Sequence, residues 1–504
     1  MRSTFTIACR GSWLSLAQAE IFKKKVAALF PGVALDIAII ETSGDKEQSK
    51  PLHLVEGRDF FTREIQDQLK QQRADFAVHS MKDVSSLDFF NEGHYAVIDR
   101  ELLYDVAIFN KGVIDKIRNG EKIIIGTSSP RRSNMATGFL QKALPVLSDK
   151  PHVIEAQSIR GNVDTRLQKL HNGDYDGIIL AAAGLNRLLK HPPAIEKVSG
   201  LLSDKKIMVL PLFECPPAAG QGAIVAETTH DNTDAIDILN AIKNEPLTNA
   251  IKEERVYAQR YGYGCSQQFG VFHLDTKAIS FTYASGKDGN AAAFTEWDFE
   301  AMIDVENKTV FSCASYMKDF FAHDLIADAV IDTNAQAFFI ASHKAVHNST
   351  LQNSIQQKRV WAAGTKTWYE LAKKGIWVEG CADGLGFENV QAVFKSPLIN
   401  IAANEIQIIT NTSSMQHWQQ DGINAVGTYT LVANLSTEIK DKIAAADIIF
   451  WASFQQYELC KTLIKKDALH ACASGKTASL LKKEGLNPIV FPTIKAFNDW
   501  YNKH

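Results

Sequence analysis

Several short segments place charged or hydroxyl side chains directly after apolar runs, where side chains are free to act on a ligand. One of them contains Ser80, Lys82 and Asp83 and follows the apolar run at residues 74–78. A carboxylate in such a loop can stabilise a developing cation and transfer protons. The alternative is a surface loop whose Lys–Asp pair contributes little to stability. Taken alone, the segment favours that alternative.

A second segment, residues 126–132, combines hydroxyl groups with two guanidinium groups after the apolar run 123–125. Pro130 suits the first position of a helix, and Ser129 suits its N-cap. Free N–H groups at a helix start, together with arginines, favour a carboxylate or a phosphate. The alternative is a solvated basic turn. The candidate ligand-binding residues of this segment are Thr127, Ser128, Ser129, Arg131 and Arg132.

Four more arginines lie beside other predicted strands or helices, namely Arg10, Arg160, Arg166 and Arg187. The net charge of the chain is −3, so these arginines do not reflect a generally basic protein. We therefore expect them to bind a ligand that carries several carboxylates, the alternative being that they lie on an ordinary solvated surface.

A cysteine flanked by glycines is a further candidate. Cys265 follows Gly262-Tyr263-Gly264, and glycine permits a sharply turned, exposed backbone. A thiol becomes a good nucleophile when nearby cations lower its pKa. A lone cysteine is more often an apolar filler of the core, so the glycines favour exposure without deciding it.

Composition excludes several classes of protein. With 504 residues, 45% of them hydrophobic and 22% charged, the chain is expected to form several globular domains. Its net charge gives no basis for nucleic-acid binding, and no apolar run reaches the roughly 20 residues of a membrane span. The seven cysteines form no C-x-x-C pair, which argues against disulfides and a structural zinc site. We expect a cytoplasmic protein without a metal and without a secretion signal.

The order of apolar runs predicts an α/β fold. Runs at 4–9, 74–78, 123–125 and 178–180 alternate with amphipathic segments up to about residue 225, as in β-α-β units. A helix at 250–260 and a strand at 278–283 predict a small α+β domain. From about residue 310 the pattern of 338–342, 364–367 and 371–375 returns at 449–453, 474–477 and 481–485. This repeat predicts two α/β lobes of one plan, although similar strand–turn–helix units could also match by coincidence.

Together these motifs resemble hydroxymethylbilane synthase (porphobilinogen deaminase) in their order and spacing over about 300 residues. The resemblance is carried by residues 8–12, Phe61, 78–84, 126–132, 160–167, 180–188, 218–223 and 264–265. It implies two periplasmic-binding-protein-like lobes, made of residues 1–100 plus 195–225 and of residues 101–194. It also implies that an α+β domain at 226–305 carries a dipyrromethane cofactor, bound covalently through Cys265.

The resemblance further implies a reaction and a role for each candidate residue. Four porphobilinogen molecules would be joined to the dipyrromethane primer with loss of ammonia, and hydroxymethylbilane would be released by hydrolysis. Asp83 would be the catalytic residue of a monomer whose partner is this small molecule. The cofactor would be held by Cys265, Lys82, Ser80, Thr127, Ser128, Arg131, Arg132 and Arg160, and the substrate by Arg10, Ser129, Arg166 and Arg187. The chain departs from the family's usual residues at Gly57-Arg58-Asp59, Ser85 and Pro130.

Residues 310–504 resemble uroporphyrinogen-III synthase, through 361–367, 382–386, Tyr429 and 474–477. This resemblance implies two α/β lobes that cyclise hydroxymethylbilane with inversion of one ring, with Tyr429 and Thr477 as the catalytic candidates and Ser453 as a weaker one. A degenerate scaffold behind a monofunctional deaminase is the alternative for this region, and a non-enzymatic anion-binding protein is the alternative for the whole chain. A P-loop ending at Gly475-Lys476 is excluded because His470 stands where that loop requires glycine.

Overall fold

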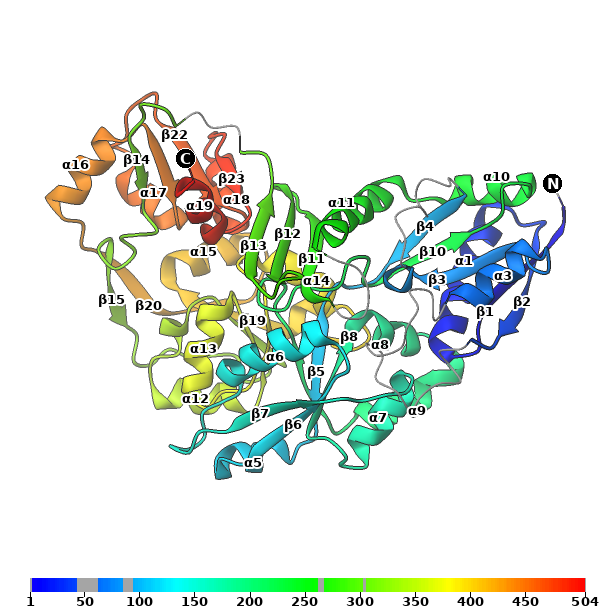
Figure 1. The fold of residues 1–504 in the computed structure, drawn as a ribbon. Coiled ribbons are helices and arrows are strands. Elements are labelled where there is room, and N and C mark those ends of the chain that lie inside the picture. Colours follow the sequence, from blue (N-terminus) through cyan, green and yellow to red (C-terminus); the bar gives the residue numbers. More distant parts are fainter. Residues whose placement is uncertain (1, 43–61, 85–93, 262–266, 302–304, 504) are drawn as a thin grey trace. The chain divides into compact units, whose positions relative to one another are not determined.

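The computed structural model describes residues 2–42, 62–84, 94–261, 267–301 and 305–503, and Figure 1 shows the order of its elements. Contacts between residues divide the chain into two units. The first comprises Met1–Gln141, Ser148–His273 and Thr282–Glu296, and the second comprises Lys142–Leu147, Leu274–Phe281 and Trp297–His504. Each unit combines helices with sheets, which confirms the predicted α/β class.

The first sheet of the first unit has the strand order β2-β1-β3-β10-β4. Its strands are β1 (Thr4–Arg10), β2 (Ala34–Ile40), β3 (Phe76–Ser80), β4 (Tyr95–Arg100) and β10 (Ala223–Glu227). Its helices are α1 (Trp13–Leu29), α3 (Arg63–Lys70) and α10 (Thr233–Ile242). β1 pairs in parallel with β2 and β3, whereas β10 is antiparallel to β3 and β4. The carboxyl ends of β1 and β3 therefore lie at the same edge of the sheet.

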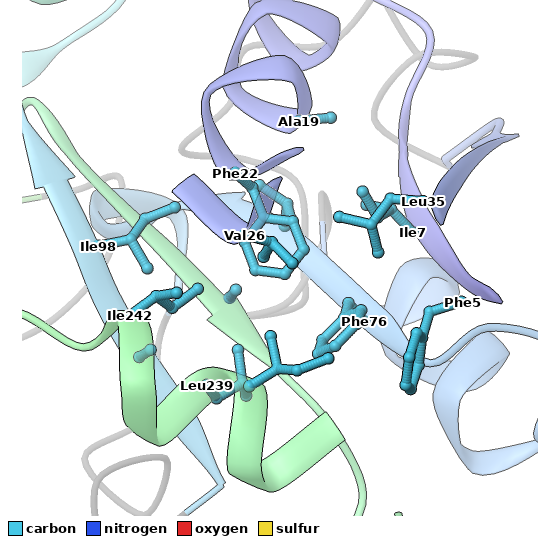
Figure 2. Close-up of a cluster of buried hydrophobic side chains, with 14 of the residues drawn as sticks. Phe5, Ile7, Ala19, Phe22, Val26, Leu35, Phe76, Ile98, Leu239 and Ile242 are labelled. Atoms are coloured by element: carbon cyan, nitrogen blue, oxygen red, sulfur yellow. The ribbon is translucent and has the colours of Figure 1, made fainter. Parts of the chain in front are cut away.

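A buried apolar cluster holds this sheet against its helices (Figure 2). Phe5, Ile7 and Phe76 project from the strands and pack against Phe22 and Val26 of α1, and all are at most 1% exposed. The rings of Phe22 and Phe76 lie 5.0 Å apart. Burying one such side chain contributes about 1.5–3 kcal/mol, so the cluster fixes the strands from which the site residues emerge.

The second sheet has the order β7-β6-β8-β5-β9. Its strands are β5 (Asp105–Phe109), β6 (Lys122–Gly126), β7 (Val153–Gln157), β8 (Gly177–Ala181) and β9 (Lys206–Val209). Its helices are α5 (Val113–Asn119), α6 (Pro130–Ala143), α7 (Val163–His171), α8 (Ala182–Leu188) and α9 (Pro192–Leu202). The expectation that residues 195–225 return to the first lobe is wrong for their first part, because β9 pairs with β5. The chain returns to the first sheet only at β10.

The α+β domain expected at 226–305 also begins later than expected, because α10 packs on β4 and α1 of the first sheet. Helix α11 (Glu245–Tyr261) leads towards a three-stranded sheet in the order β11-β12-β13. These strands are β11 (Gln268–Asp275), β12 (Ser280–Lys287) and β13 (Ala293–Asp298). The predicted helix at 250–260 and strand at 278–283 are confirmed, apart from small shifts at their ends.

The second unit contains a six-stranded sheet in the order β15-β20-β19-β16-β17-β18. Its strands are β15 (Phe321–Leu325), β16 (Ala337–Ile340), β17 (Arg359–Ala362), β18 (Val378–Cys381), β19 (Ile406–Asn411) and β20 (Ala425–Ala433). Its helices are η3 (His343–Ala345), α12 (Ser349–Gln356), α13 (Thr365–Lys373), α14 (Phe387–Phe394), η4 (Ala403–Glu405) and α15 (Thr412–Gln420).

A four-stranded parallel sheet, β14-β21-β22-β23, forms the other lobe of this unit. Its elements are β14 (Val310–Ser312), α16 (Thr437–Ala445), β21 (Ile448–Trp451), α17 (Phe454–Cys460), β22 (Leu469–Ala473), α18 (Lys476–Lys483), β23 (Ile489–Phe491) and α19 (Ile494–Tyr501). The succession β16-α12-β17-α13-β18-α14 matches β21-α17-β22-α18-β23-α19, which confirms that two lobes share one plan.

Membrane-spanning helices and metal-binding clusters are both absent from the described ranges. None of the helices there combines the length and the hydropathy that crossing a membrane requires. The same ranges hold no group of three or more His, Cys, Asp or Glu side chains that could bind a metal ion.

Candidate active site

A pocket of about 270 Å³ lies in the first unit, between the carboxyl ends of its first sheet and helices of its second. Eight of the predicted site residues line it: Arg10, Ser80, Lys82, Asp83, Arg132, Arg160, Arg166 and Arg187. The structure thus brings together groups that are up to 177 residues apart in the chain (10 to 187). Thr127, Ser128, Ser129 and Arg131 do not line this pocket.

The loop that carries Lys82 and Asp83 contains the short 3₁₀ helix η2 (Met81–Asp83) and is held in place by buried neighbours. Met81, between Ser80 and Lys82, is fully buried, and the following Val84 is 5% exposed. Arg255 of α11 donates hydrogen bonds to the carbonyl oxygens of Met81, at 3.5 Å, and of Val84, at 2.7 Å. This anchoring leaves Lys82 exposed and Asp83 half-buried at the pocket wall.

Gln18 and Arg255 were not predicted as site residues, although both support this loop. Gln18 of α1 lines the pocket and donates a hydrogen bond of 2.7 Å from Nε2 to Oγ of Ser80. A glutamine within an apolar helical pattern, 3% exposed, was the available signal. The burial of Arg255 is visible only in the structure, where it is 2% exposed, and a buried charged residue requires a partner.

Helix α6 starts as predicted. Pro130 is its first residue, and Oγ of Ser129 accepts a hydrogen bond from the backbone N–H of Arg132 at 3.4 Å. The hydroxyl of Ser128 instead turns to the backbone of Ile159, with which it exchanges bonds of 2.6 and 3.1 Å. Ser128 thereby ties the end of β6 to the loop that precedes Arg160.

The two arginines at this helix start converge on Asp105, the first residue of β5. Nη2 of Arg131 lies 2.8 Å from Oδ2 of Asp105, and Nη2 of Arg132 lies 2.7 Å from Oδ1. Arg131 also donates to the carbonyl oxygen of Pro216 at 2.6 Å, and Gln221 donates to Asp105 Oδ1 at 3.0 Å. Arg131 is thus committed to protein partners, whereas Arg132 also faces the pocket.

Burial and charge set the ionisation of these groups. Burial alone would raise the pKa of Asp105, but the guanidiniums of Arg131 and Arg132 outweigh it and hold that pKa well below its usual value. Burial, with the charges of Arg132 and Arg160, lowers the pKa of Arg166 to about 10, so Arg166 stays charged at neutral pH. The surrounding pocket walls desolvate Lys82 and so lower its pKa, although its side chain opens into the pocket.

Arg187 of α8 and Arg166 of α7 reach the pocket from helices beside the second sheet. Arg187 is 4% exposed, donates to the carbonyl oxygen of Gly222 at 2.5 Å and lies 3.7 Å from Asp99. Gly222 has a φ of +80°, and a Cβ there would lie 2.7 Å from the carbonyl oxygen of Glu101. Only glycine permits this turn without strain, and the turn supplies the acceptor that orients Arg187.

Cys265 lies outside the described residues, as do Phe61, Ser85 and Gly57-Arg58-Asp59. Each of the six cysteines in the described ranges is buried. Burial raises the pKa of the Cys9 thiol to about 11 and that of the Cys472 thiol to about 12, which makes them poor nucleophiles. Cys265 therefore stays the candidate attachment point by its sequence context.

The two candidates of the second unit lie in its different lobes. Tyr429 is on β20, 4% exposed, and its hydroxyl bonds to the side chains of Asn411 and Ser342. Burial raises the pKa of Tyr429, so the phenol stays protonated. Thr477, half-buried, is the second residue of α18. Asn411 was not predicted; its position at the end of a buried strand was the available signal.

Comparisons with known proteins place the first unit in a family. Residues 5–237 match the family model described as "Porphobilinogen deaminase, dipyromethane cofactor binding domain". A probable porphobilinogen deaminase from Methanocella arvoryzae is 36% identical over 273 residues, which are 53% of this chain and 78% of the relative. The chain belongs to the porphobilinogen deaminase family. The porphobilinogen deaminase of Fusobacterium nucleatum is 33% identical, over 56% of this chain and 87% of its own.

The similarity to solved structures is weaker than the similarity to these relatives in sequence. The uroporphyrinogen-III synthetase of Helicobacter pylori aligns with 36% of this chain and 90% of its own, at 13% identity and a TM-score of 0.24. A score of that size does not establish a shared fold. The family model matches residues 5–237, and residues 310–504 lie outside that match.

The pocket fits the dipyrromethane cofactor of the porphobilinogen deaminase family. Among the described residues its lining holds six basic side chains, those of Arg10, Lys82, Arg132, Arg160, Arg166 and Arg187, and two acidic ones, those of Asp83 and Asp164. Basic side chains therefore outnumber acidic ones in this lining, although Asp105 pairs with Arg132 and Asp99 lies near Arg187. A dipyrromethane made from two porphobilinogens carries two acetate and two propionate groups, which the basic side chains can neutralise.

Proposed function

We propose that this chain is a hydroxymethylbilane synthase that joins four porphobilinogen molecules, each with loss of ammonia, and releases the linear product by hydrolysis. The observation that carries the proposal is the pocket in which Asp83 faces a group of arginines. The porphobilinogen deaminase family supports the same reaction. We further propose that the chain acts as a monomer in the cytoplasm.

The arginines bind and orient carboxylate side chains in this proposal. Arg10, Arg166 and Arg187 take those of incoming porphobilinogen, while Lys82, Arg132 and Arg160 take those of the cofactor. Guanidinium–carboxylate pairs are directional and strong. Ser80, Thr127, Ser128, Ser129 and Arg131 complete the proposed set, and the contacts of Ser128 and Arg131 suit a role in positioning the loops beside them.

Asp83 acts on the substrate. Departure of ammonia from the aminomethyl group of porphobilinogen leaves a cation that is delocalised over the pyrrole ring. The carboxylate of Asp83 stabilises that cation and accepts or returns a proton at the pyrrole nitrogen. Bound dipyrromethane supplies the pyrrole carbon to which the new ring is joined, and we propose that Cys265 holds it through a thioether.

Mass spectrometry tests the attachment. The full chain purified without added cofactor is expected to weigh more than its sequence by one dipyrromethane unit, with the addition on the peptide that contains Cys265. The peptides that contain Cys9 and Cys472 are expected to be unmodified, because those thiols are buried and have raised pKa values. An active preparation with an unmodified Cys265 would contradict the proposal.

For the second unit we propose uroporphyrinogen-III synthase activity, in which hydroxymethylbilane is closed with inversion of one ring and loss of water. Support comes from the two α/β lobes and from Tyr429, whose protonated hydroxyl is held by Asn411 and Ser342. Such a phenol can donate a proton to the departing hydroxyl group. Thr477 is the second proposed catalytic residue. The rival is a scaffold without activity.

Product analysis distinguishes an active second unit from a scaffold without activity. Incubation of the full chain with porphobilinogen, followed by oxidation, is expected to give uroporphyrin III. Tyr429→Phe, which keeps the ring and removes the hydroxyl, is expected to shift the product towards uroporphyrin I by about 10²-fold in the III-to-I ratio. Consumption of porphobilinogen serves as the control and is expected to be unchanged. Uroporphyrin I alone from the unaltered chain would show that the second unit is inactive.

A further inference from the structure

The carboxyl edge of the six-stranded sheet carries a cluster of basic side chains that the deaminase reaction does not use. Lys344 lies in η3, directly after β16, and Lys366 lies in the first turn of α13, directly after β17. β16 and β17 are parallel, so both lysines emerge at the same edge. His323 reaches this edge from β15.

The cluster leads to Tyr429 through close contacts. Nζ of Lys344 lies 2.7 Å from Nε2 of His323. An ammonium group only donates hydrogen bonds, so Nε2 is the acceptor and His323 is neutral. The ring of His323 lies 5.5 Å from that of Tyr429. A group bound at Lys344 is therefore close to the phenol that we propose for the cyclisation.

The charges that act on Lys344 are of like sign. Burial lowers the pKa of Lys344, and the charges that add to this effect are those of Lys366 and Lys318. None of the three forms an ion pair with a carboxylate in the described part of the chain. Glu370, which follows Lys366 by four residues on α13, pairs with Lys373 at 2.7 Å. Bringing like charges together costs free energy, which a bound anion would offset.

The start of α13 adds hydrogen-bond donors at the same edge. Its N-cap is Gly364, and no side chain caps the helix. The first N–H groups of this nine-residue helix are therefore available to an anion beside Lys366.

We propose that Lys344, Lys366 and Lys318 bind carboxylate side chains of the linear tetrapyrrole released by the first unit, and that Lys344 and His323 position it beside Tyr429. The inference rests on the proposed cyclisation for its substrate. The linear product carries two carboxylates on each ring, so several separate lysines suit it better than they suit one small anion.

Lysine acylation, read by mass spectrometry of peptides, tests the site on the full chain. Uroporphyrin III, a stable tetrapyrrole with the same acid groups, is the probe. We expect saturating uroporphyrin III to slow the acylation of Lys344 and Lys366 by about tenfold, and to leave exposed Lys395 on the same lobe unaffected. Equal protection by inorganic phosphate at the same concentration would overturn the tetrapyrrole assignment, as would no protection by either.

A variant gives a second measurement. Lys344→Gln is expected to raise about tenfold the uroporphyrin III concentration that half-protects Lys366, and to lower the III-to-I ratio. Lys395→Gln is the matched control and should change neither. Far-UV circular dichroism and thermal unfolding of the full chain report that the second unit is folded in both variants, and porphobilinogen consumption reports the same for the first unit. Unchanged protection of Lys366 in Lys344→Gln would refute the proposal. Protected lysines with only uroporphyrin I from the unaltered chain would instead support this site and refute the cyclisation.

Discussion

Replacing Asp83 with alanine is expected to lower the kcat of hydroxymethylbilane formation by about 10²–10⁴-fold and to leave the fold intact. In the described part of the pocket lining there are two carboxylates, and Asp164 pairs with the ammonium of Lys197 at 3.2 Å. Asp83 is thus the carboxylate available to a cationic pyrrole. Because its loop is anchored by Met81 and by Arg255, the substitution removes charge without disturbing the backbone.

Three variants separate charge from shape. Asp83→Asn keeps the volume and removes the charge, so it should be nearly as slow as Asp83→Ala. Asp164→Asn removes the other carboxylate of the pocket, and we expect a loss of less than about tenfold because Lys197 already neutralises it. Initial rates of porphobilinogen consumption and thermal midpoints give the comparison. Near-normal turnover of Asp83→Ala would remove Asp83 from the catalytic role.

Much of the first site could be predicted because parallel strands share an edge. Arg10 is the last residue of β1 and Asp83 follows β3, and these strands pair in parallel. A residue placed directly after such a strand reaches the common edge wherever it stands in the sequence. The same reasoning placed Arg187 correctly, since it lies just beyond β8.

The partner of each arginine could not be predicted in the same way. Arg131 and Arg132 are adjacent on α6, and the sequence gives them equal claims on a ligand. Only the structure shows that Asp105, at the start of β5, pairs with both arginines, and that Arg132 also lines the pocket. β5 follows β4 in the chain but joins the other sheet, and such crossings depend on long-range packing. For the same reason, the assignment of β9 to the first lobe was wrong.

The repeat in the second unit was visible because each lobe uses the same start signals. Ser342 caps η3 after β16, and Ser453 caps α17 after β21. The basic cluster at the carboxyl edge of the six-stranded sheet could not be predicted from the repeat. Its member His323 comes from β15, which pairs antiparallel with β20 and lies outside the repeat. Local pattern thus predicted the plan of each lobe, but not the side chains that an extra strand brings to it.

Asp105→Ala is expected to destabilise the first unit by about 3–5 kcal/mol, because it leaves two guanidinium groups in the protein interior without their counterion. Asp105 is 1% exposed and Arg131 is 4% exposed, so water cannot replace the lost carboxylate. At about 2–4 °C per kcal/mol, the thermal midpoint should fall by roughly 10 °C. Turnover should also fall, since Arg132 lines the pocket and loses the group that orients it.

The pH dependence of this effect follows from the lowered pKa of Asp105. A carboxyl group whose pKa is lower in the folded state contributes stability above its unfolded value of about 3.9 and loses that contribution on acidification. The difference between the unaltered chain and Asp105→Ala should therefore be constant above about pH 5 and narrow below about pH 4. Asp115→Ala, which breaks the exposed pair with Arg118, is the control and should cost less than about 1 kcal/mol. Equal stabilities of Asp105→Ala and Asp115→Ala in urea unfolding at pH 7 would contradict a buried ion pair at the base of the pocket.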